Sequence, residues 1–316
     1  MLANKLISQK NKKISFYEKL IFIIIILIIL KKNKHYRLQI CLCSIGKKEN
    51  LYIKEFVDHY KRLGYDKIYL YDNNDKNGER FKDVLSEYIK DNFVIIIDYI
   101  GYKKKSGGIQ MEAYYDCYQK NSDKYDWLSF FDIDEFLEIK KHNSIKEFLS
   151  EKKFEKCENI KINWIMYSDN GLTYYDGRKV QERFTDPLLN DSANIHIKST
   201  IRGHMKINYW TNSTNPHSSK INVTSCTSTG EIIKDYKSPF FIPPTYEYAY
   251  LKHYNTKTIE EFIKKVKRGW VDILQKLDNN LWKEKIKFFF RRNKKNKEKL
   301  AYIKNILNIS INETFE

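Results

Sequence analysis

The chain has 316 residues, of which 42% are hydrophobic, so it is long enough to bury the core of one large α/β domain and to carry a tail. Only 11 Gly and 5 Pro are present, which excludes a low-complexity middle of the chain. The net charge of +17 suits nucleic acid, anionic lipid or phosphorylated small molecules, and much of the charge lies near the two ends.

The first 36 residues are predicted to associate with a membrane. An uninterrupted apolar run, Leu20 to Leu30, is preceded by Lys10, Lys12 and Lys13 and is followed at once by more lysines. A spanning helix needs roughly 20 apolar residues, so this run of eleven favours a short anchor, an interfacial helix or a retained signal-like segment. No small-residue cleavage site follows the run.

From residue 38 onward, short apolar runs alternate with segments of helical periodicity. The apolar runs predict strands over 38–44, 67–71, 93–97 and 127–131. The periodic segments predict helices over 51–63, 81–88 and 109–120. This alternation is typical of a parallel, doubly wound sheet, in which ligands bind beyond the carboxyl ends of the strands. Polar residues occupy all four of these ends and predict a nucleotide site: Ser44, Asp72, Asp98 and Asp132.

The second half of the chain is less regular. A strand is predicted over 158–166, and residues 169–244 are interpreted as irregular β structure and long loops that cover a cleft. Thr258 and Glu261 form a capping box that begins a helix. Nine Lys or Arg lie between Lys283 and Lys299, which favours contact with an anionic membrane surface or, as the alternative, a solvated charged face.

Five cysteines are scattered along the chain, and no pair has the spacing of a zinc site. Cys41 and Cys43 lie inside an apolar strand pattern, so we expect them to fill the core. An odd number of cysteines without a framework favours reduced thiols and a cytosolic domain.

The strongest chemical signal is the sequence Asp132-Ile133-Asp134, which directly follows the fourth predicted strand. Residues i and i+2 of a strand face the same way, so two carboxylates could reach one hard cation. Mg²⁺ or Mn²⁺ prefers oxygen ligands and shares them with diphosphate oxygens, where it neutralises the charge on a leaving group. The alternative is a strand end exposed to solvent.

Three further residues are candidates for the same site. His253 precedes the capped helix, where a neutral imidazole could complete a metal site or hold a phosphate. Lys198 and Arg202 could pair with a diphosphate, or could belong to a basic loop in a basic protein.

Several blocks, in this order, resemble the family 92 glycosyltransferases and the related branch of family 2, which share the GT-A fold. The blocks lie at 44–64, 69–73, 127–136, 164–171, 182–184, 198–202 and 253–269. The resemblance implies a GT-A type nucleotide-binding domain over 37–270, with a mostly parallel central sheet flanked by helices. An N-terminal hydrophobic segment, 1–36, would precede this domain, and a helical basic tail, 271–316, would follow it.

The resemblance also implies an activity: metal-dependent, inverting transfer of a hexose from a nucleotide-sugar, expected to be UDP-linked, to a glycan or lipid-linked acceptor in surface polysaccharide or glycoconjugate synthesis. Inversion requires a base that deprotonates the acceptor hydroxyl. The residues assigned to Mn²⁺ or Mg²⁺ are Asp132, Asp134 and His253. The residues assigned to the donor are Ser44, Asp72, Asn73, Asp98, Gln110, Lys198 and Arg202. The candidates for the base are Asp169, Glu182 and Asp186.

Other classes of function stay open from the sequence. The charge suits a nucleic-acid-binding protein or a membrane-surface protein without catalysis, and paired carboxylates also serve phosphoryl- or nucleotidyl-transfer enzymes. We expect no nucleic-acid partner, because the charge lies largely at the ends and no base-stacking motif or helix-turn-helix is present. We expect a membrane-associated protein with a cytoplasmic catalytic domain of bacterial type, with a Golgi-type anchor as the alternative.

Overall fold

The computed structural model describes residues 20–25, 38–100, 108–207, 223–233, 240, 243–268 and 279–307. The chain divides into two compact units, Met1–Leu38 and Gln39–Glu316. In the first unit, residues 20–25 form a helical turn whose side chains are exposed, and the rest of the predicted apolar run lies outside the described residues. Within the described ranges, no helix has the length and apolar character needed to cross a membrane.

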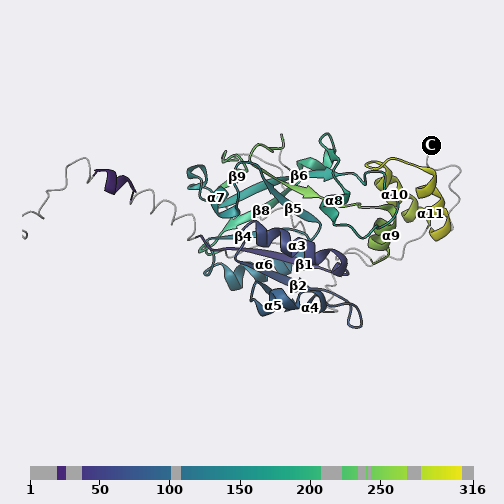
Figure 1. The fold of residues 1–316 in the computed structure, drawn as a ribbon, viewed down its shortest axis with the longest axis horizontal. Helices are drawn as coiled ribbons and strands as arrows, with labels where there is room; N and C mark the ends of the chain where they lie inside the picture. Colours follow the sequence, from purple (N-terminus) through teal and green to yellow (C-terminus); the bar gives the residue numbers. More distant parts are fainter. Residues whose placement is uncertain are drawn as a thin grey trace, which may run out of the picture. The chain divides into compact units, whose positions relative to one another are not determined.

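The second unit contains a mixed sheet flanked by helices, as Figure 1 shows. Its main path runs β3-β2-β1-β4-β8-β6-β10-β5, and β7 and β9 each pair with β6. The strands of this path are β1 (Ile40–Gly46), β2 (Lys67–Asp72), β3 (Val94–Asp98), β4 (Trp127–Phe130), β5 (Glu135–Ile139), β6 (Asn159–Tyr167), β8 (Ile197–Arg202) and β10 (Ala249–His253). The two short strands are β7 (Pro187–Leu188) and β9 (Ser225–Thr227).

The first four strands along the chain, β3, β2, β1 and β4, are parallel to one another, as the alternating pattern predicts. All seven residues of β1 are buried, because helices cover both faces of this half of the sheet. Neighbouring residues of a strand face opposite sides, so Phe131 contacts Tyr60 of α3 (Asn50–Arg62), and Phe130 contacts Tyr114 of α6 (Ile109–Asn121).

The predicted helix over 81–88 is two shorter helices, α4 (Phe81–Val84) and α5 (Ser86–Lys90). They are separated at Leu85, whose φ of −117° and ψ of 16° lie outside the helical region. The hydrophobic spacing hides this break, because Phe81, Leu85 and Tyr88 are all buried on the same side.

Beyond β4 the pairing is mixed. β8 is antiparallel to both β4 and β6, β10 is parallel to β6, and β5 is antiparallel to β10. From the sequence, residues 169–244 are interpreted as irregular β structure and long loops that cover a cleft. That interpretation is wrong for β8, which is a central strand of the sheet with five of its six residues buried. Its two basic residues, Lys198 and Arg202, mask the apolar pattern that would have indicated a strand.

Three helices gather at one end of this unit in Figure 1: α9 (Ile259–Arg268), α10 (Asn279–Phe290) and α11 (Lys297–Leu307). They share one hydrophobic cluster, in which Phe262 and Val266 of α9 lie with Ile286, Phe289 and Ile303. The basic segment after residue 279 is therefore packed against the helix that the capping box begins. That box is formed as predicted, since the Glu261 amide donates to Thr258 Oγ1 and the Thr258 amide donates to Glu261 Oε2, each at 3.2 Å.

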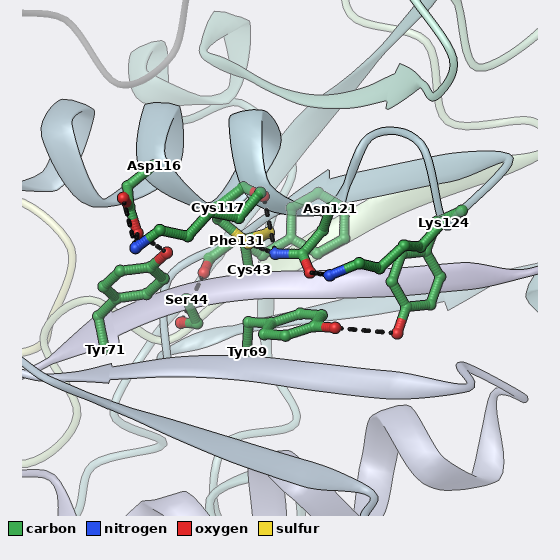
Figure 2. Close-up of a disulfide and its surroundings, with 11 residues drawn as sticks. Cys43, Ser44, Tyr69, Tyr71, Asp116, Cys117, Asn121, Lys124 and Phe131 are labelled. Atoms are coloured by element: carbon green, nitrogen blue, oxygen red, sulfur yellow. Dashed lines mark hydrogen bonds and ion pairs between the residues drawn. A yellow bond between two sulfur atoms is a disulfide. The ribbon is translucent and has the colours of Figure 1, made fainter.

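Four of the five cysteines form disulfides, so the expectation of reduced thiols is wrong. Cys43 of β1 is bonded to Cys117 of α6, and Cys157 is bonded to Cys226 of β9, which leaves Cys41 as the free thiol. The partners are separated by 74 and 69 residues, so their pairing depends on the tertiary fold and has no local signal. Figure 2 shows Cys43–Cys117 joining the strand to the helix beside it.

Candidate functional site

The acidic sequence forms a tight turn between β4 and β5. The Asp132 amide donates to Glu135 Oε2 at 2.9 Å, and the Glu135 amide donates to the Asp132 carbonyl at 3.0 Å. Between the two aspartates, Ile133 is 3% exposed and packs against Gly46 at the end of β1. A Cβ at residue 46 would lie 2.1 Å from Ile133 Cδ1, so any larger residue there would force the Ile133 side chain to move.

The Asp132 carboxylate lies in a cluster built from α6 and β8. Its Oδ1 accepts hydrogen bonds from Tyr114 OH at 2.9 Å and from Gln110 Nε2, and lies 2.8 Å from Lys198 Nζ. The Lys198 ammonium is fully buried and also lies 3.6 Å from Glu135 Oε1. Burial raises the pKa of Glu135 well above its usual value, and the neighbouring aspartates raise it further.

The Asp134 carboxylate contacts a different set of groups. Its Oδ2 lies 2.7 Å from Lys265 Nζ of α9, and its Oδ1 lies 3.5 Å from His253 Nε2 of β10. Burial opposes ionisation of Asp134, but the charge of Lys265 and a hydrogen bond from His253 hold its pKa well below the usual value. Burial lowers the pKa of His253, which favours the neutral imidazole.

The structure therefore brings Asp132, Asp134, His253, Lys198 and Gln110 to one edge of the sheet, but gives each aspartate its own lysine. In the part of the chain that the structure describes, no three His, Cys, Asp or Glu side chains are placed so that they could hold a metal ion. The donor types are nevertheless those that a hard divalent cation takes, because one turn supplies two carboxylates and His253 supplies a neutral imidazole beside one of them.

Two participants were missed from the sequence. Tyr114 follows Gln110 by four residues on α6, so both side chains lie on the same face of the helix and reach the same carboxylate oxygen. Lys265 lies 131 residues after Asp134 along the chain. The helical spacing of Gln110 and Tyr114 was a usable signal, whereas nothing local indicated Lys265.

The residues assigned to the nucleotide at the ends of β1 and β2 are engaged within the protein. Ser44 Oγ donates to the Phe131 carbonyl at 2.8 Å, which links β1 to β4 (Figure 2). Asp72 is 1% exposed and accepts hydrogen bonds from the amides of Asn74 and Phe81, and Asn73 Nδ2 donates to the Tyr99 carbonyl. These side chains shape the loops at the edge of the site.

Asp98, at the end of β3, is exposed. Its Oδ1 accepts a hydrogen bond from the Ile100 amide at 2.9 Å and so holds the start of the loop after the strand. No contact joins it to the Asp132 and Asp134 clusters in the described residues.

Arg202 is not brought to the site, which corrects its assignment to the diphosphate. In the register of β8 with β4, Arg202 lies opposite Trp127 at the far end of the sheet, while Ser199, next to Lys198, lies opposite Phe130. The guanidinium donates to the Phe154 carbonyl at 2.8 Å and lies 4.3 Å from the Trp127 ring centre. It is therefore a structural residue.

The three candidates for the base lie in different surroundings. Asp169 is 1% exposed and forms an ion pair with the buried Lys299 of α11, so it is not accessible to an acceptor hydroxyl. Glu182 is exposed on α8 (Val180–Arg183). Asp186 is also exposed and accepts a hydrogen bond from Ser168 Oγ at 3.0 Å.

Of the three candidates for the base, Asp186 is the one that the strand pairing places near His253. Ser168 directly follows β6, and Met166 of β6 lies opposite His253 of β10. The Ser168 amide also donates to the Asp186 carbonyl at 3.0 Å, so backbone and side chain both fix Asp186 near this end of β6.

Comparison with solved structures gives low scores. The bacterial enzyme TarS of S. aureus, residues 1–349, superposes with a TM-score of 0.36 at 8% identity, covering 87% of this chain and 76% of that one. A mannosyltransferase of Pyrobaculum calidifontis, solved with GDP-Man and Mn²⁺, gives 0.31 at 9% identity, covering 40% of this chain and 36% of that one. We draw nothing further from these likenesses.

Comparison with protein sequences is more informative. A family 92 protein of Oryza sativa subsp. japonica is 25% identical over 120 residues, covering 37% of this chain and 20% of the relative. One of Arabidopsis thaliana is 20% identical over 205 residues, covering 56% of this chain and 34% of the relative. The alignments thus span a fifth to a third of these longer relatives. The family model described as Glycosyltransferase family 92 matches residues 36–305. The chain therefore belongs to glycosyltransferase family 92.

Proposed function

We propose that this protein is a metal-dependent, inverting glycosyltransferase that moves a hexose from a nucleotide-sugar, expected to be UDP-linked, to a glycan or lipid-linked acceptor. Family membership supports sugar transfer. The observation that carries the rest is the pair of carboxylates, Asp132 and Asp134, at the edge of the sheet where the parallel strands end, with His253 3.5 Å from Asp134.

Asp134, His253 and Asp132 are the residues that would hold Mn²⁺ or Mg²⁺. When bound, the cation would supply charge neutralisation for the leaving nucleoside diphosphate. The protein prepares its ligands for this role. The nearby Lys265 ammonium keeps Asp134 ionised, and burial favours the neutral His253 imidazole, so both have the protonation state that binds a cation.

Lys198 positions Asp132 rather than the donor. Its ammonium is enclosed between Asp132 Oδ1 and Glu135 Oε1 and is fully buried, so it has no free surface to offer a diphosphate. Tyr114 and Gln110 hold the same Oδ1 from α6. Three donors on one oxygen fix the orientation of the Asp132 carboxylate. A fixed orientation is what catalysis by electrostatic stabilisation requires, because the charged groups must already be in place when the reaction begins.

Asp186 is our candidate for the base that deprotonates the acceptor hydroxyl. It is exposed, so an acceptor can reach it, and Ser168 holds its Oδ2. Inversion requires the base on the face of the sugar opposite the leaving diphosphate. Glu182 is the second candidate, since it is exposed on the helix just before Asp186.

We further propose that the protein is membrane-associated, with the apolar run of residues 20–30 and the basic segment 271–316 contacting an anionic surface. The two disulfides favour an oxidising compartment for the second unit, as with a Golgi-type anchor. Thiol alkylation before and after reduction tests the disulfides.

Nucleotide-sugar hydrolysis with and without Mn²⁺, measured on the wild type and on Asp134→Ala, tests the enzymatic proposal. Cation-dependent turnover by the wild type supports it, and equal turnover by the variant contradicts the assignment of the cation site.

A further inference from the structure

A basic pocket adjoins the Asp134 cluster. It has a volume of about 260 Å³ and lies between the loop and first turn of α3 that follow β1 and one face of α9. Five basic and three acidic side chains line it, and the basic ones are Lys48, Lys257, Lys264, Lys265 and Arg268. Lys265 connects the pocket to the proposed catalytic centre, because its Nζ lies 2.7 Å from Asp134 Oδ2.

Lys257 is the distinctive residue of this pocket. It is 5% exposed, and no carboxylate of the described residues lies within ion-pair distance of its ammonium. Its Nζ lies over the Tyr52 ring, 4.4 Å from the ring centre. A buried ammonium without a direct ion-pair partner is costly, so a lysine placed in this way at a pocket favours the binding of an anion there.

Two acidic residues of the pocket, Glu49 and Glu261, act on the Lys257 charge only from beyond ion-pair distance, because both have closer partners. Glu261 is held by both guanidinium nitrogens of Arg183, at 2.7 and 2.8 Å. Glu49 is paired with Arg268, and Glu79 accepts a hydrogen bond from the Asn50 amide at 2.9 Å. The positive charge of Lys257 is therefore available to a ligand.

The backbone at the pocket is held in an unusual conformation. Lys257 and Lys48, which both line the pocket, each have a φ of 53°, a region that residues other than glycine rarely adopt. Such conformations persist where the surrounding structure fixes them, and they are common at ligand-binding sites. At Lys48 the constraint is visible, because its amide donates to Asn74 Oδ1 at 2.7 Å.

The volume limits what the pocket can contain. Sites that enclose a whole drug-sized ligand have volumes of about 300 Å³ or more, so a nucleotide-sugar would place only part of itself here. The volume suits a diphosphate group. Three of the basic side chains are already paired with carboxylates outside the lining, so Lys257 supplies the positive charge that a phosphate oxygen would meet.

We infer that this pocket holds the diphosphate of the nucleotide-sugar donor, with the Lys257 ammonium paired to a phosphate oxygen next to Asp134. The inference rests on the proposed function for the identity of the donor. It assigns phosphate binding to α9 and to the loop before it, rather than to Lys198 and Arg202.

The experiment compares the binding of inorganic pyrophosphate to the wild type, Lys257→Met and Lys120→Met by titration calorimetry, in EDTA so that divalent cations play no part. Lys120 is the matched control, because it is exposed on α6 and pairs only with Asp116. We expect Lys257→Met to weaken binding at least about tenfold, because a charge-assisted contact is lost, and Lys120→Met to bind as the wild type does.

A second variant covers the case in which Lys257→Met does not fold, which its thermal transition reveals. Lys48 is 44% exposed at its side chain, so Lys48→Met should fold normally and should weaken pyrophosphate binding by a smaller factor, about threefold. If both variants fold and bind pyrophosphate as tightly as the wild type, the inference is wrong. If the wild type binds no pyrophosphate, it is also wrong.

Two further arms identify the source of the diphosphate. UDP should compete with pyrophosphate in the wild type, and it should do so more strongly than geranyl diphosphate in detergent. Competition by geranyl diphosphate alone would place a lipid acceptor in the pocket and overturn the assignment to the donor. Normal turnover of nucleotide-sugar with unchanged KM in Lys257→Met would overturn the pocket assignment alone, whereas a wild type that binds pyrophosphate without using any nucleotide-sugar would overturn the proposed function.

Discussion

Lys198 Nζ lies 2.8 Å from Asp132 Oδ1, and the lysine side chain is fully buried. The same ammonium lies 3.6 Å from Glu135 Oε1, so one buried cation serves two carboxylates at the turn between β4 and β5. The corresponding partner of Asp134 is Lys265, which comes from a different part of the fold. The two aspartates of the acidic sequence therefore depend on separate supports, which mutations can distinguish.

Replacing Lys198 by Met should destabilise the fold strongly. The change leaves Asp132 and Glu135 without their cation inside the protein, and breaking a buried pair from one side costs about 3–5 kcal/mol. Denaturant unfolding measures the loss. Lys120→Met, an exposed control, should change the free energy of unfolding by less than about 0.5 kcal/mol. A loss in Lys198→Met no larger than that of the control would show that Lys198 does not support the turn.

The contact between Arg183 and Glu261 should be strongly coupled. The guanidinium and the carboxylate form two hydrogen bonds, of 2.7 and 2.8 Å, and the two side chains are 0% and 3% exposed. Arg183→Met should lower the free energy of unfolding by about 3–5 kcal/mol, because it leaves Glu261 buried without its cation. Adding Glu261→Gln should recover part of that loss, with a coupling energy of about 0.5–3 kcal/mol in a double-mutant cycle. Strictly additive effects would argue against the pair.

Lys161 should give the protein a measurable pH dependence. Burial lowers the pKa of its ammonium from 10.5 to about 7 in the folded state. Between these values the unfolded chain holds a proton that the folded protein has released, so stability rises with pH in this window, by up to about 1.4 kcal/mol per pH unit. Below pH 7 both states are protonated and the contribution is constant.

The check for Lys161 is unfolding of the wild type and Lys161→Met at pH 7, 8 and 9. The variant lacks the titrating group. The free energy of unfolding of the wild type should therefore rise relative to that of the variant as the pH rises. A difference that is the same at all three pH values would mean that Lys161 does not titrate in this range.

Alkylation should detect one thiol before reduction. Cys41 is the free cysteine, and the other four are paired as Cys43–Cys117 and Cys157–Cys226. Denatured, unreduced protein should gain one adduct by mass spectrometry, and reduced protein should gain five. Three or five adducts before reduction would contradict the pairing. The double variant Cys43→Ala with Cys117→Ala should lose about 4 kcal/mol of stability, because the bond closes a long loop.

The parallel half of the sheet could be predicted from the sequence because its strands are continuous apolar runs that end in polar residues. β1, β2, β3 and β4 each begin and end within about a residue or two of their predicted limits, and they lie side by side as expected. β8 could not be recognised, because Lys198 faces a buried acidic cluster and Arg202 covers Trp127, so a central strand looks like a basic loop.

Part of the candidate site could also be predicted from the sequence, because some of its residues lie at the ends of recognisable strands. Asp132, Asp134 and His253 follow or end strands, so local pattern and strand order place them at one edge. Lys265 and Lys257 come from the segment around α9, and their positions depend on how that helix packs. The burial of Asp169 also depends on a distant element, since Lys299 lies 130 residues later in the sequence. Contacts between distant elements leave no periodic signal.

The most direct test of the central claim is the hydrolysis of a nucleotide-sugar by the wild type, by Asp134→Ala and by the exposed control Asp91→Ala, each with and without Mn²⁺. Asp91 lies at the end of α5, and its ion pair with Lys61 is exposed. Our account predicts cation-dependent turnover by the wild type and by the control, and at least about a hundredfold loss in Asp134→Ala with an unchanged unfolding transition. Turnover of wild-type magnitude in a folded Asp134→Ala would contradict it.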